Sequence, residues 1–373
     1  MSGRSSISAT LCSLLALFAI VFACPVVNSQ TTDGPLLVPP VPEPEALAAP
    51  EQSVTPPTVP PVPGPSVAAP NAVVDGYWLV GTESSPQSFD ESLPRFCASV
   101  RRYEACNGVR PSSLQELSGS LAPHVPVIIV VHGSFMDSPS IVPESRKTWQ
   151  WLQRGSCGQP FQMIYFTWPS FRQLSIAPAI DVAVLGRQAS RNGFYLAQLI
   201  QSIPDQCPVS LVGHSHGTRV IAAALHLTAG GTVEGHTLRC RSCVDRDVRV
   251  VFAASAIDHD WLNPGERFDR TMWSADCLVN LRNEQDPALL IYPLRRLGSS
   301  RALGRSGFTS SDRSELGRTS ARIAEVDVTK TIGHRHLWPA YLEDASLPQR
   351  IRNHLYFADQ VSKYQVSSTT SRQ

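Results

Sequence analysis

A serine flanked by glycines is the part of this sequence best suited to do chemistry. The pentapeptide G-H-S-H-G at 213–217 follows an apolar run at 209–212 and begins a helical segment at 216–227. A serine hydroxyl is a weak nucleophile, so a reactive one must be exposed on a sharp turn beside a base. Glycines on either side let the strand and the helix pack closely around that turn, and the helix start directs free N–H groups at the reacting centre. The pattern predicts Ser215 as a nucleophile.

A second loop has the residues to stabilise the negative charge that such an attack creates. The residues H-G-S-F at 132–135 follow an unbroken, largely β-branched run at 125–131. Backbone N–H groups must already point at the developing oxyanion. We expect one donor at His216, directly after the nucleophile, and the other at Ser134, with Phe135 as the alternative.

A general base must reach the nucleophile, and histidine is the usual choice. In this kind of site the chain order is serine, acid, histidine. His334 follows a strand-like run at 323–328 and is the predicted base. His336, two residues further on, and His354, in a terminal helical segment, are the alternatives.

Three aspartates are candidates for the acid that orients the base. Asp286 lies in a polar turn after a strand-like run at 277–281, whereas Asp258 and Asp260 follow the run at 249–254. A buried carboxylate in such a place holds the imidazole in the required tautomer and stabilises the imidazolium. The other interpretation of Asp258 and Asp260 is a helix cap or a turn. The residues alone leave the choice open.

The elements that must position these side chains alternate between apolar strand-like runs and longer helical segments. This alternation predicts an α/β fold, a mostly parallel central sheet with helices on both faces. The segment 82–120 is less regular, and 169–185 could form an apolar wall over the site. The expected strands are 77–81, 125–131, 161–168, 209–212, 249–254, 277–281 and 323–328, and the expected helices are 146–152, 189–202 and 216–227.

The N-terminal part of the 373-residue chain is predicted to stay outside this domain. Residues 1–29 have the basic start, short apolar run and small residues of a signal peptide, which predicts an exported protein, either secreted, periplasmic or associated with the cell envelope. The sequence before Cys24 also resembles a lipobox, so a lipid anchor at Cys24 is the alternative. The Pro-rich segment 30–70 cannot build a core and is expected to be a disordered, extended linker or tether. Residues 71–373 are long enough for one large α/β domain.

The composition of the chain limits which kinds of binding partner are expected. The formal net charge is +1, and the Arg-rich stretch 295–318 lacks interleaved aromatic residues, so we expect a solvated loop and no nucleic-acid partner. No cofactor is implied. The pair His214-x-His216 has metal-ligand spacing but flanks a residue that points away from both, so no metal site is predicted. Of nine cysteines, the seven after the signal segment are disulfide candidates. We expect Cys97 and Cys106 to close a loop, and the cysteines at 207, 240 and 277 to pair at one end of the sheet.

The whole set of motifs resembles the α/β-hydrolase superfamily, and within it a bacterial branch of esterase/lipase-like hydrolases. The resemblance covers about residues 75–340 and consists of H-G at 132–133, W-P-S at 168–170, the elbow at 213–217, D-P-A-L at 286–289 and G-H at 333–334. The order of these motifs agrees with the family throughout. An aromatic residue is expected after the histidine, where this chain has R-H-L at 335–337.

The resemblance implies a Ser215–Asp286–His334 triad and the cleavage of carboxylic ester or related acyl bonds through an acyl-enzyme. A small-molecule or lipid-like acyl compound is the expected substrate. Two other functions stay open, namely a catalytically inactive binding protein of the cell envelope and an acyltransferase, which shares the acyl-enzyme and differs in the acceptor.

Overall fold

The computed structural model describes residues 76–88, 95–171, 178–238, 246–295 and 298–360. The predicted signal peptide and the Pro-rich segment lie outside these ranges. Within the described ranges, no helix combines the length and the apolar character needed to cross a membrane.

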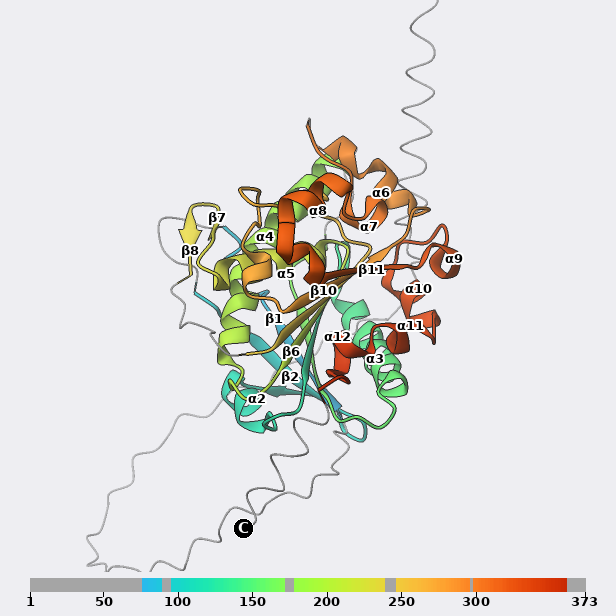
Figure 1. Cartoon of the computed structure of the whole chain (residues 1–373). Helices are drawn as coiled ribbons and strands as arrows, with labels where there is room; N and C mark the ends of the chain where they lie inside the picture. The colour runs from blue at the N-terminus through green and yellow to red at the C-terminus, as the bar shows by residue number, and fades with distance from the viewer. Residues whose placement is uncertain (1–75, 89–94, 172–177, 239–245, 296–297, 361–373) are drawn as a thin grey trace, which may run out of the picture. The chain divides into compact units, whose positions relative to one another are not determined.

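A nine-stranded sheet forms the centre of the described part of the chain, in the order β11-β10-β9-β6-β4-β5-β1-β2-β3 (Figure 1). Every neighbouring pair from β11 to β1 is parallel, whereas β2 and β3 add an antiparallel hairpin at one edge. The predicted α/β class with a mostly parallel sheet is confirmed. The strands are β1 (Gly76–Gly81), β2 (Ser99–Glu104), β3 (Gly108–Ser112), β4 (Val127–Val131), β5 (Gln162–Thr167), β6 (Val209–His214), β9 (Val248–Ala253), β10 (Cys277–Arg282) and β11 (Ile323–Asp327), with a separate hairpin of β7 (Thr232–Val233) and β8 (His236–Thr237).

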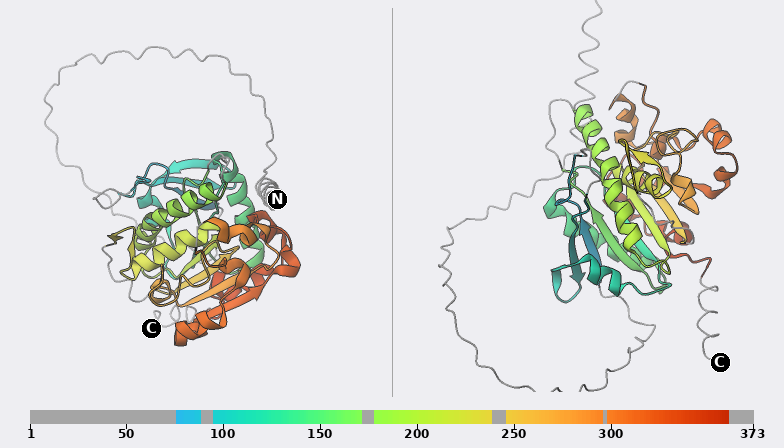
Figure 2. Two further views of the ribbon diagram at one scale, coloured as in Figure 1. Left: turned by 90° about the horizontal axis from the view of Figure 1, so that it is seen from above. Right: turned by 90° about the vertical axis from the view of Figure 1, so that its left-hand side faces the viewer.

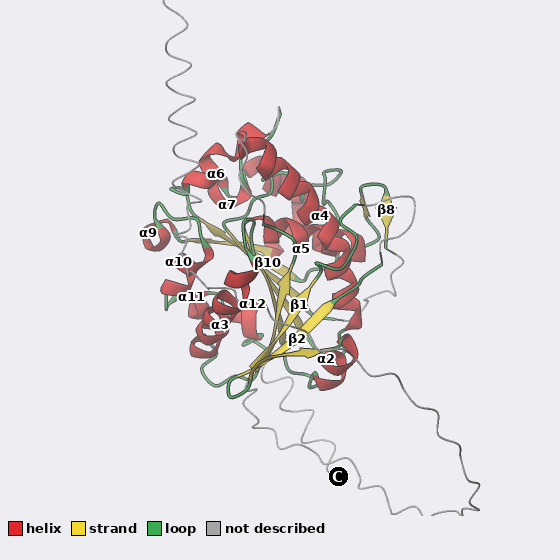
Figure 3. Ribbon diagram, turned by 180° about the vertical axis from the view of Figure 1, so that it is seen from behind, coloured by secondary structure: helices red, strands yellow, loops and turns green. Residues whose placement is uncertain are grey.

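Helices cover both faces of this sheet (Figures 2 and 3). Ile129 and Val131 of β4 pack into a core with α4 and α5, whereas Ile128 and Val130 pack into a second core with α3 and the C-terminal helices. Successive side chains of a strand point to opposite faces, so one apolar run supplies both cores. The helices are α2 (Leu114–Ser120), α3 (Ser138–Gly155), α4 (Pro178–Ser202), α5 (His216–Thr228), α6 (Pro287–Ile291), α7 (Leu303–Ser306), α8 (Ser310–Leu316), α9 (Thr329–Ile332), α10 (Trp338–Glu343), α11 (Leu347–Arg350) and α12 (Arg352–Tyr356), with the 3₁₀ turns η1 (Thr271–Trp273), η2 (Tyr292–Arg295) and η3 (Gly317–Arg322).

The edge hairpin of β2 and β3 was not predicted, because only Val100 and Tyr103 of β2 are buried and the other side chains are polar or charged. The expected Cys97–Cys106 disulfide is wrong, since both residues are free thiols. They lie beyond opposite ends of the six-residue strand β2, which alone separates its ends by about 17 Å, far more than a disulfide can span. Cys207 and Cys277 are also free, and Cys240 lies outside the described residues.

The Arg-rich stretch is likewise not the solvated loop expected from its composition. It contains the short helices α7 and α8, and two of its arginines form ion pairs with acidic side chains. Arg295 forms an ion pair with Asp258, and Arg313 lies 3.1 Å from Glu325. These contacts hold the stretch against the strand ends next to the predicted site.

Candidate active site

Ser215 occupies the turn between β6 and α5 in a backbone conformation that few residues adopt. Its φ of 52° and ψ of −122° lie where a side chain is strained. Two backbone hydrogen bonds hold it there, one from its N–H to the carbonyl of Ala253 at 2.9 Å and one from the N–H of Thr218 to its own carbonyl at 3.1 Å. The serine is therefore set on a fixed, sharp strand-to-helix turn, as the motif predicts.

The glycines of the motif are required by close packing around this turn. A Cβ added at Gly217 would lie 2.2 Å from the carbonyl oxygen of Val131, and one at Gly213 would lie 2.8 Å from the backbone nitrogen of Thr218. Real Cβ contacts are not that short, so a side chain at either position would push α5 away from β4 or β6. Both glycines let the helix start directly against the strands.

His336 is the histidine that contacts Ser215. Its Nε2 lies 3.1 Å from the serine Oγ, and its Nδ1 lies 2.8 Å from Oδ2 of Asp286. A carboxylate only accepts hydrogen bonds, so Nδ1 carries the proton and Nε2 presents its lone pair to the serine hydroxyl. Ser215, His336 and Asp286 are 7%, 5% and 0% exposed, so this chain of contacts is shielded from bulk water.

Asp286 is positioned by the start of helix α6. It is the N-cap residue, and its Oδ1 accepts the N–H of Leu289 at 3.0 Å while Oδ2 faces His336. Capping a helix fixes the carboxylate and leaves one oxygen directed at the imidazole. The structure thus brings Asp286, and neither of the other two aspartates, to the histidine.

The prediction that His334 reaches the serine is wrong. Gly333 turns the chain with φ of 62°, after which His334 is exposed and His336 is buried. His334 instead lines a cavity of about 300 Å³ that also borders His336, together with Leu337 and Glu343. His354 lies near the opposite end of β6, where its carbonyl accepts the hydroxyl of Ser210 at 2.7 Å, so it is far from the elbow.

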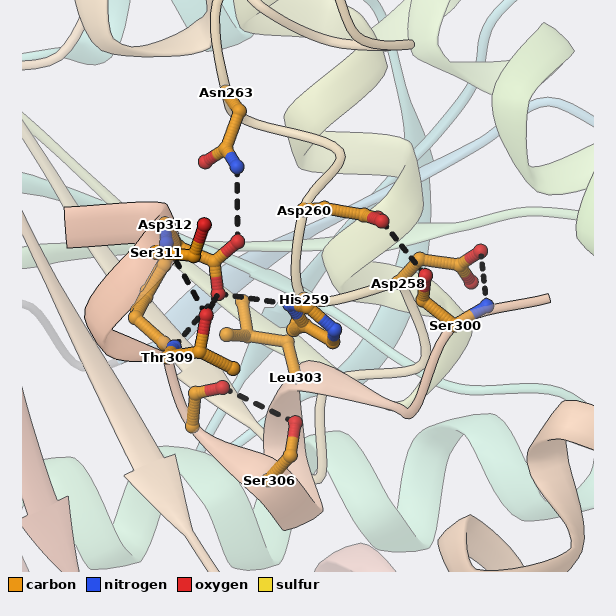
Figure 4. Close-up of polar contacts among 12 residues, drawn as sticks. Asp258, His259, Asp260, Asn263, Ser300, Leu303, Ser306, Thr309, Ser311 and Asp312 are labelled. Carbon is orange, nitrogen blue, oxygen red and sulfur yellow. Dashed lines mark hydrogen bonds and ion pairs between the residues drawn. The ribbon is translucent and has the colours of Figure 1, made fainter. Parts of the chain in front are cut away.

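Asp258 and Asp260 belong to a different network (Figure 4). Asp258 is an ion-pair partner of Arg295 and accepts the Tyr292 hydroxyl at 3.0 Å. Asp260 accepts the hydroxyl of Ser300 at 2.7 Å. Both carboxylates tie the loop after β9 to residues 292–300, which agrees with the structural interpretation of these aspartates.

The H-G-S-F loop lies directly beside the serine. A Cβ added at Gly133 would lie 2.9 Å from the Cβ of Ser215. The N–H of Phe135 donates to the carbonyl of Ser170 at 2.8 Å, so it is already engaged. Within the described part of the chain, the N–H groups of Ser134 and His216 have no such acceptor. These two donors are the ones the geometry leaves for an oxyanion.

The W-P-S motif holds this loop in place. The backbone N–H of Trp168 donates to Nε2 of His132 at 3.2 Å, and its indole N–H donates to the carbonyl of His132 at 3.0 Å. The Ser170 hydroxyl accepts the N–H of Met136 at 3.3 Å. The W-P-S motif therefore fixes the backbone on both sides of Gly133.

Two residues that hold the segment around His336 in place were not predicted from the sequence. Asn283 donates its side-chain amide to the carbonyl of Gly333 at 2.8 Å, which ties the histidine loop to the turn that carries Asp286. His214 lies 2.8 Å from the carbonyl of His336 through Nε2, so this ring nitrogen donates to the backbone of His336. Both contacts join segments far apart in the sequence, so no local sequence pattern predicts them.

Burial keeps the other histidines of the site neutral. It lowers the pKa of His132 to about 4 and that of His214 to about 3. Burial, followed by the charge of Arg219, lowers the pKa of His216 well below its usual value. His214 and His216 direct their rings to different partners, the His336 carbonyl and the Ser134 hydroxyl, so the pair does not converge as metal ligands must.

The expected apolar wall at 169–185 lies partly outside the described residues. Of its described members, Phe171 and Ile180 are each 62% exposed. These apolar side chains follow the end of β5 and begin α4, at the same edge of the sheet as the elbow.

No protein-family model matches the chain, and no curated protein matches its sequence. Similar solved structures include Zea mays acyl-protein thioesterase 2, with a TM-score of 0.34 and 12% identity over 63% of this chain and 95% of that one. EstE1, a thermophilic carboxylesterase from a metagenomic library, has a TM-score of 0.32 and 12% identity over 69% of this chain and 85% of its own. An acetylxylan esterase has a TM-score of 0.30 and 9% identity over 63% and 96%. At these TM-scores the likenesses carry no argument about this chain, whose fold and site are described from its own residues.

Proposed function

We propose that this protein is a serine hydrolase that cleaves carboxylic ester or related acyl bonds. The observation that carries the proposal is the continuous contact from Ser215 Oγ to His336 Nε2, at 3.1 Å, and from His336 Nδ1 to Asp286, at 2.8 Å. A nucleophile, a base and an orienting acid in this arrangement are the parts that acyl transfer requires.

In the first half of the reaction, Ser215 Oγ attacks the acyl carbon while its proton passes to Nε2 of His336. The carbonyl oxygen becomes an oxyanion, and the backbone N–H groups of Ser134 and His216 stabilise it. Collapse of this intermediate breaks the bond to the leaving group, which takes the proton from His336. Asp286 stabilises the imidazolium while it exists.

In the second half, water replaces the leaving group. His336 accepts a proton from the water as its oxygen attacks the acyl carbon of the ester on Ser215. Collapse of the second intermediate returns the proton to Ser215 Oγ and releases the carboxylic acid. If an alcohol attacked the acyl-enzyme in place of water, the protein would be an acyltransferase.

The substrate class follows from the surroundings of the site. The cavity beside His336 is lined by Pro287, Leu337, Pro339 and Ala340, which suit an alkyl group, and also by His334, Arg335 and Glu343. We therefore propose an acyl ester with an aliphatic portion as substrate.

We also propose that the protein acts outside the cytoplasm, tethered or released through its N-terminal segment. The support is the basic residue Arg4 followed by an apolar run at 11–23 and the Pro-rich stretch at 30–70. Mass spectrometry of the mature N-terminus tests this proposal. Mature chains starting near Gln30 indicate secretion, an acylated Cys24 indicates an anchor, and an intact Met1 contradicts export.

The hydrolase proposal is tested with p-nitrophenyl esters of increasing acyl length. The wild-type protein is expected to hydrolyse at least one member of the series, and Ser215→Ala to abolish this activity. Ser210→Ala is the matched control, because Ser210 lies on the same strand and contacts the His354 carbonyl at the far end. A folded wild-type protein that hydrolyses no ester of any length would contradict the proposal and favour the binding role.

A further inference from the structure

Ser134 and His216, whose backbone N–H groups are the proposed oxyanion donors, also contact each other through their side chains. Ser134 Oγ lies 2.6 Å from Nδ1 of His216. Each of these atoms can donate or accept, depending on where the imidazole proton sits. If Nδ1 is bare, the serine must donate its hydrogen to it. If Nδ1 carries the proton, the serine accepts and its own hydroxyl hydrogen stays available.

Arg219 lies on the other side of the His216 ring. It is 5% exposed, and its Nε donates to Ser190 Oγ at 2.7 Å while its guanidinium lies 4.9 Å from the centre of the Trp261 ring. A Cβ added at Gly186 would lie 2.5 Å from Nη1 of Arg219 and 3.4 Å from Nε2 of His216. Nη1 of Arg219 and Nε2 of His216 therefore border the same space left by the missing side chain of Gly186, and the charge of Arg219 acts on the His216 ring.

This charge decides between the two tautomers. Within the described part of the chain, Nε2 of His216 is buried and has no hydrogen-bond partner. A proton on Nε2 would be an unsatisfied buried donor facing a cation, which is costly. A lone pair on Nε2 faces the same cation favourably, and it places the proton on Nδ1. The ring stays neutral because burial and then Arg219 lower its pKa.

We propose that Arg219 holds His216 in the Nδ1–H tautomer and thereby frees the hydroxyl of Ser134 to act as a third donor to the oxyanion. This inference rests on the proposed hydrolase function. Ser134 is then a catalytic residue through its side chain, whereas Arg219 and the His216 ring are positioning residues. The loop that carries this hydroxyl lies beside the nucleophile, since a Cβ added at Gly133, the preceding residue, would lie 2.9 Å from Cβ of Ser215.

Kinetics of a double-mutant cycle test the proposal. Ser134→Ala keeps both backbone donors and is expected to lower kcat about 10²-fold, with KM nearly unchanged, because an oxyanion donor acts in the transition state. Ser134→Thr restores the hydroxyl and most of kcat. Arg219→Met is expected to lower kcat about tenfold in the wild-type background and to have little further effect in Ser134→Ala. Arg267→Gln removes an exposed arginine from the same Trp261 ring and is the matched control.

A second measurement reads the tautomer without any turnover. In protein with ¹⁵N-labelled histidine, the ring signals of His216 are identified by their loss in His216→Asn. A protonated Nδ1 and a bare Nε2 are expected in the wild type. The opposite tautomer would overturn the proposal even if Arg219→Met did not fold.

The two proposals fail in different ways. An active wild type whose Ser134→Ala variant keeps full kcat overturns the third donor and leaves the hydrolase in place. If Arg219→Met lowered kcat equally with and without the Ser134 hydroxyl, Arg219 would have a structural role. That result would overturn the proposal that Arg219 acts through His216 on Ser134. A wild type that neither hydrolyses esters nor reacts with a phosphonate overturns the proposed function itself, and the hydroxyl's role with it.

Discussion

Two of the histidine–aspartate pairs among the described residues, His336–Asp286 and His259–Asp312, share the same contact geometry. Nδ1 lies 2.8 Å from a carboxylate oxygen in both His336–Asp286 and His259–Asp312. Asp312 also accepts the N–H and the hydroxyl of Thr309, at 2.6 Å and 2.7 Å, within the capping box of α8, and the pair joins the loop after β9 to that helix (Figure 4). In the first pair the second ring nitrogen faces Ser215.

The comparison shows that the contact between histidine and aspartate does not by itself define a catalytic pair. Among the contacts of the described residues, none joins the second nitrogen of His259 to a hydroxyl. The carboxylate of Asp312 is satisfied by a helix cap and by Asn263 at 2.9 Å, so its role is to hold a loop. In the proposed mechanism, the contact of the second ring nitrogen with Ser215 is what distinguishes the His336–Asp286 pair from the His259–Asp312 pair.

The largest expected effect comes from removing His336, and the same change in the other pair is its control. His336→Asn is expected to lower kcat at least about 10⁴-fold, because the serine loses its base. His259→Asn, the matched change, should keep kcat within about threefold and cost about 1 kcal/mol of stability through its lost hydrogen bond. Steady-state ester hydrolysis and urea unfolding measure the two effects. Similar kcat losses in both variants would contradict the distinction between a catalytic and a structural pair.

The aspartates should differ in the same sense. Asp286→Asn keeps the cap on α6 but is expected to lower kcat about 10³- to 10⁴-fold, since the amide favours the wrong imidazole tautomer. Asp312→Asn is expected to leave kcat intact and to lower the free energy of unfolding by about 1–3 kcal/mol. Retained activity in Asp286→Asn would remove this residue from the mechanism.

The buried histidines around the elbow predict acid sensitivity of the fold. The pKa values of His132 and His214 fall from 6.5 to about 4 and about 3 in the folded protein. Between these values and 6.5 the unfolded chain binds more protons at these two positions, so their contribution to the free energy of unfolding falls as the pH is lowered below about 6.5. Glu144, whose pKa burial raises to about 7, contributes in the opposite sense. For His132 the loss is on the order of 3 kcal/mol. Urea unfolding from pH 7.5 to 4 measures it, and His132→Gln should flatten the profile. A variant profile parallel to that of the wild type would contradict this origin.

The smallest effect is expected at His334. Because its side chain is exposed and makes no contact with Ser215, His334→Ala should change kcat by less than about threefold and the free energy of unfolding by about 0.5 kcal/mol or less. The same ester assay and urea unfolding measure both quantities. A kcat loss above about 10²-fold would reinstate His334 as the base.

The chain's local patterns were sufficient for the parallel strands and the elbow, but not for the histidine that contacts Ser215. Among the three candidate aspartates, the resemblance and not the local pattern selected Asp286. Apolar runs and the glycine motif reflect contacts between near neighbours, and so they can be read from the sequence. The choice between His334 and His336 depends on the turn at Gly333 and on Asn283, which binds that turn from a different strand end. Trp338, two residues beyond His336, is buried.

The same limit explains the other errors. Cys97 and Cys106 are close in sequence but flank β2, a strand whose charged residues conceal its alternation. The Arg-rich stretch looked like a solvated loop because ion pairs such as Arg295–Asp258 involve partners from distant segments. Neither the edge strand nor the arginine partners have a local signature.

The most direct test of the Ser215–His336–Asp286 assignment is the rate at which a fluorophosphonate labels the protein. We predict that intact mass and peptide mapping will show one adduct on Ser215 in the wild type, and no adduct in Ser215→Ala. His336→Asn should slow labelling at least about 10³-fold, whereas His334→Asn and His259→Asn should label at the wild-type rate. Labelling that persists in Ser215→Ala, or that is unaffected by His336→Asn and lost in His334→Asn, would contradict the assignment.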